Sequence, residues 1–143
     1  MTHTNLLPEH FSATETDDRY DCYSLSVPVR IFGFLLEEDT MEDCFSIALP
    51  AGADLEQMLP VVNEYIQWLG CCEEELTAYF EQQLDEPLPA DWYDKIEVMD
   101  VSITFDSSED YGATIAFGES VCADHTIEID IDGREITDSR LIG

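Results

Sequence analysis

Residues 126–133 have the sequence Thr-Ile-Glu-Ile-Asp-Ile-Asp-Gly, and this stretch decides the fold. Its apolar side chains are Ile127, Ile129 and Ile131, and its acidic side chains are Glu128, Asp130 and Asp132. A strict period of two predicts a β-strand with one buried face and one face toward solvent. The Asp-Gly pair at 132–133 favours a tight hairpin turn, so residues 136–142 are expected to pair back. The stretch therefore predicts an antiparallel hairpin that presents neighbouring carboxylates.

Two more strands are predicted before this hairpin. Residues 101–105 and residues 111–117 both alternate apolar with small or polar side chains. Ile96 and Val98 lie on the opposite parity from the apolar residues of the first segment, which predicts a β-bulge near residues 99–100.

The amino-terminal part of the chain has a different pattern. Residues 1–19 are polar and without periodicity, so we expect a flexible acidic arm. Residues 23–36 are apolar on both parities, which predicts a strand buried on both faces. Residues 37–43 are acidic and predict a turn, and residues 45–49 alternate as a returning strand would.

Two helices are predicted between the strand segments. Asp54 and Gln57 form a capping-box pattern before a helical apolar period that continues to Leu69. Pro60 predicts a kink or a late start of this helix. Residues 73–84 form the second helix, and three glutamates fall in its first turn, where the helix dipole favours carboxylates.

This order of elements predicts the fold class. Two strands, two helices and then three or four strands favour an α+β domain over residues 20–143. We expect an antiparallel sheet of five to six strands with the helical pair on one face.

Charge is the most unusual property of the composition. The chain has 33 Asp and Glu against 5 Lys and Arg, a formal net charge of −28. Such a surface repels nucleic acid and anionic membranes and favours a basic protein or a cation. The 45% apolar fraction is that of a folded protein, and five irregularly spaced cysteines suit reduced thiols. No apolar run reaches membrane-spanning length, so we expect a cytoplasmic protein that binds neither nucleic acid nor membrane.

The familiar catalytic and metal motifs are absent from this sequence. A calcium loop with Glu128 as first ligand would place Ser139 where a bidentate Glu is needed. Asp124 could orient His125 beside Cys122, but the three do not make a recognisable catalytic set with an oxyanion site. The vicinal cysteines at 71–72 do not have CxxC spacing. We therefore expect no catalytic residue, metal or cofactor.

Three acidic groups and one aromatic pair are the candidate partner-binding residues. They are Glu37, Glu38, Asp39, Glu42 and Asp43; Asp106, Glu109 and Asp110; Glu128, Asp130 and Asp132; and Trp92 with Tyr93. The two aromatic residues are either core residues or, if they are exposed beside the acidic loops, an interface anchor. An even spread gives about 270 Å² of surface per net charge, against about 110 Å² for DNA. Only clustering on about half of the surface would therefore resemble a nucleic acid.

The acidic turns at residues 37–43 and 106–110, with the closing segment 125–143, resemble bacterial immunity proteins of toxin–immunity systems. The resemblance implies a small cytosolic α+β domain that binds and blocks a basic toxin domain, frequently a nuclease. It matches no specific motif, so it assigns no functional residue.

Three hypotheses for function follow. The first is a non-enzymatic inhibitor that reaches a basic partner by electrostatic steering. The second is an adaptation to high salt, in which acidity is a property of the whole surface. The third is an enzyme or a cation-binding domain whose site lies among ordinary carboxylates.

Overall fold

The computed structural model describes residues 6–37, 44–119 and 124–142. Within these ranges, two sheets and two α-helices make an α+β fold, which confirms the predicted class. Seven strands form the main sheet in the order β1-β2-β5-β6-β7-β8-β9, and β3 with β4 forms a second, two-stranded sheet. Neighbours in the main sheet are antiparallel except β5 and β6, which are parallel. The expectation of an antiparallel sheet of five to six strands is therefore wrong in the number of strands and in the β5–β6 pair.

The carboxyl-terminal strands are those that the sequence predicts. They are β6 (Glu97–Phe105), β7 (Tyr111–Gly118), β8 (Ile127–Asp132) and β9 (Glu135–Leu141). The pairing of β6 with β7 shifts register between Val98 and Asp100, which confirms the predicted bulge. Gly133 has a φ of 60° in the β8–β9 turn, a conformation that glycine adopts without steric cost.

The prediction of a flexible arm over residues 1–19 is wrong for the part that the structure describes. A 3-10 turn, η1 (Pro8–His10), leads into β1 (Phe11–Thr16), which pairs with β2 (Tyr20–Leu25). Asp17 Oδ1 accepts hydrogen bonds from the backbone N–H groups of Arg19 and Tyr20, at 2.7 and 2.8 Å, and so closes the turn. β1 is an edge strand with five exposed residues, and for that reason its sequence carries no apolar alternation.

The predicted strand over residues 23–36 is also wrong. The segment contains the end of β2, then β3 (Val29–Ile31) and β4 (Phe34–Leu36), which form a hairpin of their own. Phe32 and Gly33 make its two-residue turn with φ angles of 61° and 104°, as a type I′ turn requires. The returning strand exists as β5 (Phe45–Pro50), and its antiparallel partner is β2.

Both helices occur where the sequence places them. They are α2 (Leu55–Leu69) and α3 (Glu73–Leu84), followed by the 3-10 turn η2 (Tyr93–Lys95). Asp54 Oδ1 accepts a hydrogen bond of 3.0 Å from the N–H of Glu56, so α2 begins at its cap and not at Pro60. The predicted late start is therefore wrong.

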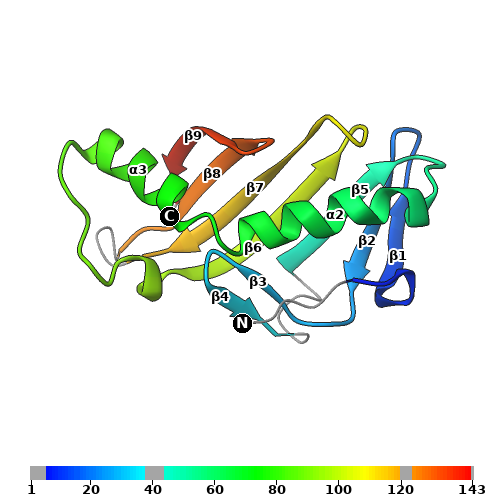
Figure 1. Ribbon diagram of the computed structural model, residues 1–143, viewed down its shortest axis with the longest axis horizontal. Helices are drawn as coiled ribbons and strands as arrows, with labels where there is room; N and C mark the ends of the chain where they lie inside the picture. Colours follow the sequence, from blue (N-terminus) through cyan, green and yellow to red (C-terminus); the bar gives the residue numbers. More distant parts are fainter. Residues whose placement is uncertain (1–5, 38–43, 120–123, 143) are drawn as a thin grey trace.

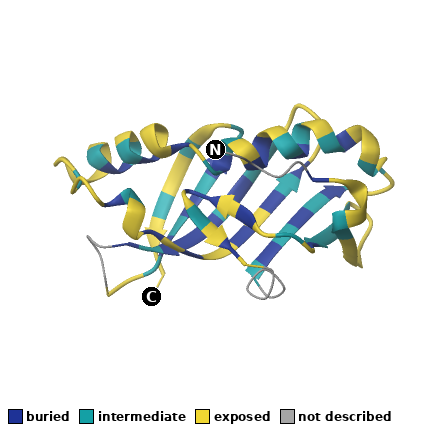
Figure 2. Cartoon of the chain, turned by 60° about the horizontal axis from the view of Figure 1, so that its bottom comes forward, coloured by how far each residue is buried: buried dark blue, intermediate teal, exposed yellow. Residues whose placement is uncertain are grey.

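The helices and the β3–β4 hairpin lie on one face of the main sheet (Figure 1). From α2, the ring of Tyr65 lies edge-on to Phe105 of β6 at 6.0 Å. From α3, the ring of Phe80 lies edge-on to Phe117 of β7 at 6.0 Å, and Phe32 of the hairpin turn contacts the same ring at 5.5 Å. Buried and exposed residues consequently alternate along the strands (Figure 2). In the described ranges, no helix covers the opposite face of the sheet.

Candidate functional site

The face of the main sheet that points away from the helices is the candidate site, and we call it the open face. Register aligns its outward residues in three rows across the strands β5 to β9. The rows are Ser46–Ser102–Thr114–Asp130–Asp138, Ala48–Thr104–Gly112–Asp132–Glu135 and, from β6, Asp100–Ala116–Glu128–Arg140. Period-two strands create these rows because every second side chain points to the same side.

The open face changes in chemistry from its centre to its edge. On β5, β6 and β7 it carries mainly small and hydroxyl side chains, whereas on β8 and β9 it carries carboxylates. Arg140 is the one Lys or Arg within the strands β6 to β9. The predicted face of Glu128, Asp130 and Asp132 therefore lies on the open side of the sheet, as the alternation indicates.

Arg140 lies at the centre of the carboxylates of this edge. Its guanidinium is 2.5 Å from Glu128 Oε1, 3.0 Å from Asp130 Oδ2 and 3.6 Å from Asp138 Oδ2. The hydrogen bond from Arg140 lowers the pKa of Asp130, and Thr114 Oγ1 adds a donor at 3.1 Å. One cation meets three carboxylates, so this group keeps a net negative charge.

A second acidic group adjoins the first. An open depression of about 310 Å³ is lined by Thr104, Asp106, Asp110, Asp130 and Asp132, with neighbouring residues. Asp106 accepts a hydrogen bond from the Tyr20 hydroxyl, which ties the β6–β7 turn to β2. The structure thus brings two of the three predicted acidic groups together. Glu109 is exposed in the same turn but does not line the depression.

Of the third acidic group, only Glu37 lies among the described residues, and it is not part of this surface. Glu37 is exposed just after β4, which belongs to the hairpin on the helical side of the sheet. Glu38, Asp39, Glu42 and Asp43 lie outside the described residues.

Of the two alternatives for Trp92 and Tyr93, core packing is confirmed and an exposed anchor is wrong. Trp92 is 2% exposed, and its indole lies 5.6 Å from the ring of Phe80. Tyr93 is half-buried against the β3–β4 turn, where a Cβ on Gly33 would lie 2.7 Å from its ring. Both rings complete the apolar core under α3 and the hairpin, since an aromatic ring stabilises a core more than it stabilises an exposed position.

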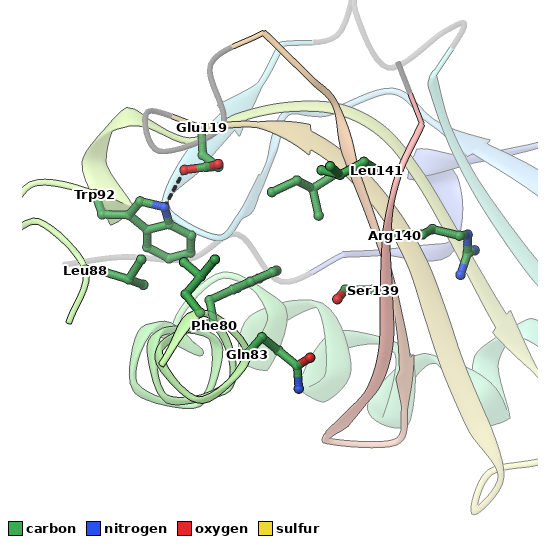
Figure 3. Close-up of a pocket in the computed structure, with 10 residues that line it drawn as sticks. Phe80, Gln83, Leu88, Trp92, Glu119, Ser139, Arg140 and Leu141 are labelled. Carbon is green, nitrogen blue, oxygen red and sulfur yellow. Dashed lines mark hydrogen bonds between the residues drawn. The ribbon is translucent and has the colours of Figure 1, made fainter. Parts of the chain in front are cut away.

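The sequence reasoning missed an apolar pocket between α3 and β9 (Figure 3). Its volume is about 210 Å³, and its lining includes Phe80, Leu88, Trp92, Ile127 and Leu141. Glu119 also lines it, is 7% exposed and accepts a hydrogen bond of 2.6 Å from Trp92 Nε1. A signal was present: Glu119 continues the inward parity of Ile115 and Phe117, so a carboxylate occupies a core-facing position.

The described cysteines lie apart from the open depression. Burial raises the pKa of the Cys72 thiol to about 12, which opposes formation of the thiolate. Cys71 is exposed, and Cys122 lies outside the described residues. No cluster of three or more His, Cys, Asp or Glu among residues 6–37, 44–119 and 124–142 is arranged to hold a metal ion. No described helix is long and apolar enough to cross a membrane.

Comparison of the chain with protein-family models, with curated proteins and with solved structures finds no match. The geometry of the open face and of the pocket is therefore the basis for a functional proposal.

Proposed function

We propose that this chain is a non-enzymatic acidic binding protein that neutralises a basic protein, with the open face as its contact surface. The observation that carries the proposal is the alignment of Thr114, Asp130 and Asp138 in one row. The neighbouring rows also place carboxylates on β8 beside small side chains on β7. In the immunity systems that the sequence resembles, the basic partner is a toxin domain, frequently a nuclease.

The arrangement of charge supports a local surface over a bulk property. An accessible surface of 8044 Å² shared evenly by 28 net charges gives about 290 Å² per charge. On the open face the carboxylates instead come from adjacent strands, and strand spacing is about 4.8 Å. Like charges that lie opposite each other on paired strands repel, and Asp132 of β8 lies opposite Glu135 of β9. A basic partner relieves this repulsion and gains steering toward the face.

The small side chains of the open face support a protein partner as well. Serine, threonine, alanine and glycine on β5 to β7 leave a surface without long side chains, on which a partner backbone can lie closely. Hydroxyl groups there can accept or donate hydrogen bonds at the centre of the contact, beside the charged edge.

Two triple variants with the same change in charge test the proposal. Glu128→Gln, Asp130→Asn and Asp132→Asn together neutralise the open face, whereas Glu73→Gln, Glu74→Gln and Glu75→Gln neutralise an exposed site on α3. Partners would be captured at low salt from the cells that make the protein. The basic protein recovered would then be purified, and its Kd measured against salt concentration.

We expect the open-face variant to weaken binding about tenfold or more and to flatten the salt dependence. The α3 variant should change Kd less than about twofold, because its charges lie on the other side of the sheet. Equal weakening by both variants would contradict the proposal and favour acidity as an adaptation to high salt. Failure to recover any basic protein would also overturn it.

A further inference from the structure

The pocket between α3 and β9 has the size of a single side chain. Its volume of about 210 Å³ lies below the range of about 300–1,000 Å³ that is usual for small-molecule sites. Figure 3 shows Phe80 and Leu88 on one side and Leu141 across from them, with the carboxylate of Glu119 beside Trp92. The pocket therefore combines an apolar wall with one carboxylate.

Glu119 gives this pocket a preference for charge. Glu119 is 7% exposed, so the cost of removing its side chain from water is already part of the folded state. An incoming cation loses only its own hydration, and a fixed acceptor that is already desolvated favours such a ligand. A neutral or anionic ligand of the same shape lacks this attraction.

We propose that the pocket receives one lysine or arginine side chain of the basic partner, with its alkyl stem along the apolar wall and its cationic head at Glu119. This inference rests on the proposed function for the source of the side chain. The stem of a lysine or arginine packs well on apolar surface while its head reaches a polar group. Charge complementarity with a chain of net charge −28 selects this occupant over an apolar or acidic one.

The strand β9 connects the pocket to the open face. Ser139 and Leu141 pair with the inward residues Ile129 and Ile127, whereas Arg140 pairs with Glu128 on the open face. Arg140 is also among the residues that line the pocket, but in Figure 3 its side chain points away from it. A partner that lies across this edge strand can therefore contact the carboxylates with one part and insert a side chain with another.

The test uses small probes in place of the partner. Butylammonium represents the lysine side chain, 1-butanol is its neutral analogue and butyrate is its anionic analogue. Each would be titrated into the protein while the indole N–H signals of Trp92 and Trp68 are followed by NMR. Trp92 Nε1 donates a hydrogen bond to Glu119, whereas Trp68 Nε1 donates one of 3.4 Å to Glu75. Trp68 does not line the pocket and serves as the internal reference.

We expect butylammonium to shift the Trp92 signal saturably, with about tenfold higher affinity than butanol and no saturable effect of butyrate. Glu119→Gln should remove the preference for the cation, whereas Glu86→Gln, which removes an exposed carboxylate near α3, should keep it. Leu141→Ala shortens an exposed part of the pocket wall and does not disturb the core. It should lower the affinity for butylammonium severalfold.

Equal binding of butanol and butylammonium, or no saturable shift by butylammonium, would overturn the inference. The three probes on the unchanged protein decide this even if Glu119→Gln fails to fold. The probe titration contains no partner, so its result is independent of the test of the open face. If the open-face variant loses partner binding but no probe binds the pocket, only the inference about the pocket is wrong.

Discussion

The hydroxyl of Tyr79 on α3 lies 3.1 Å from Ser139 Oγ on β9, and this hydrogen bond joins the second helix to the edge of the sheet. Tyr65 on α2 is the contrasting case. Its ring is fully buried, and its hydroxyl finds no hydrogen-bond partner among the described residues. Two tyrosines on neighbouring helices thus differ in whether the hydroxyl stabilises the fold.

Removal of the two hydroxyls should therefore change the free energy of unfolding differently. Tyr79→Phe should lower the free energy of unfolding by about 0.5–1.5 kcal/mol, the usual net value of a hydrogen bond. Tyr65→Phe should leave it unchanged or raise it by up to about 1 kcal/mol, because a buried hydroxyl without a partner costs free energy. Urea denaturation of both variants measures the difference. A larger loss for Tyr65→Phe than for Tyr79→Phe would contradict it.

Gly112 on β7 is required by close packing of the backbone. A Cβ at this position would lie 2.4 Å from the carbonyl oxygen of Ile131 on β8. Gly112→Ala should therefore destabilise the protein by about 2–3 kcal/mol, as overpacked substitutions do. Gly118→Ala on the same strand is the matched control, since its Cβ meets only the flexible end of Met99 at 3.4 Å. Thermal unfolding should show a clear loss for the first variant and little change for the second.

The hydrogen bond between Trp92 and Glu119 should contribute to stability. Trp92→Phe keeps a buried ring but removes the donor from a buried carboxylate, so we expect a loss of about 1–3 kcal/mol. Trp68→Phe is the control because its indole bond to Glu75 is longer and exposed. Similar losses in the two variants would show that ring size alone accounts for the effect.

Two carboxyls of the open face should titrate in opposite directions from the ordinary aspartate value of 3.8. The hydrogen bond from Arg140 lowers the pKa of Asp130, whereas burial and the charge of Glu128 raise the pKa of Asp100. The contribution of Asp130 to stability is therefore present above 3.8 and is lost as pH falls through its lower folded-state value. Ionised Asp100 is unfavourable instead, and its protonation relieves that cost as pH falls through its raised folded-state pKa.

Carboxyl ¹³C shifts measured against pH check both directions. Arg140→Leu should move the midpoint of Asp130 upward and leave the direction for Asp100 unchanged, because burial is the first cause of the Asp100 shift. An Asp130 midpoint that does not respond to this substitution would contradict the assignment of its pKa to Arg140.

The sequence predicted the elements whose apolar spacing faces one core. The strands β6 to β9, their bulge and both helices follow from such spacing, as in Ile127, Ile129 and Ile131. The β3–β4 hairpin was missed because Phe32 occupies a positive φ position where Asn, Asp or Gly is usual. An exposed edge strand such as β1 has no periodic signal, so it resembled a loose arm.

The residues of the candidate site were likewise predictable only where a local sequence pattern places them. Alternation placed Glu128, Asp130 and Asp132 on one face, but only the β7–β8 pairing shows that the acidic turn of Asp106 and Asp110 lies beside them. The buried position of Trp92 depends on contacts with α3, which are distant in sequence and carry no local pattern. Pairings between remote strands and helices therefore marked the limit of the sequence reasoning.

The parallel pairing of β5 with β6 has a consequence for the order of folding. Residues 51–96, which contain both helices, must cross the sheet before these two strands can meet. The pairs β6–β7, β7–β8 and β8–β9 join strands that follow each other directly in the chain, as do the pairs β1–β2 and β3–β4. Such local pairings close short loops, whereas the β5–β6 contact closes a long one. We therefore expect the carboxyl-terminal meander to form early and the closure of the helical crossover to determine how fast the native state is reached.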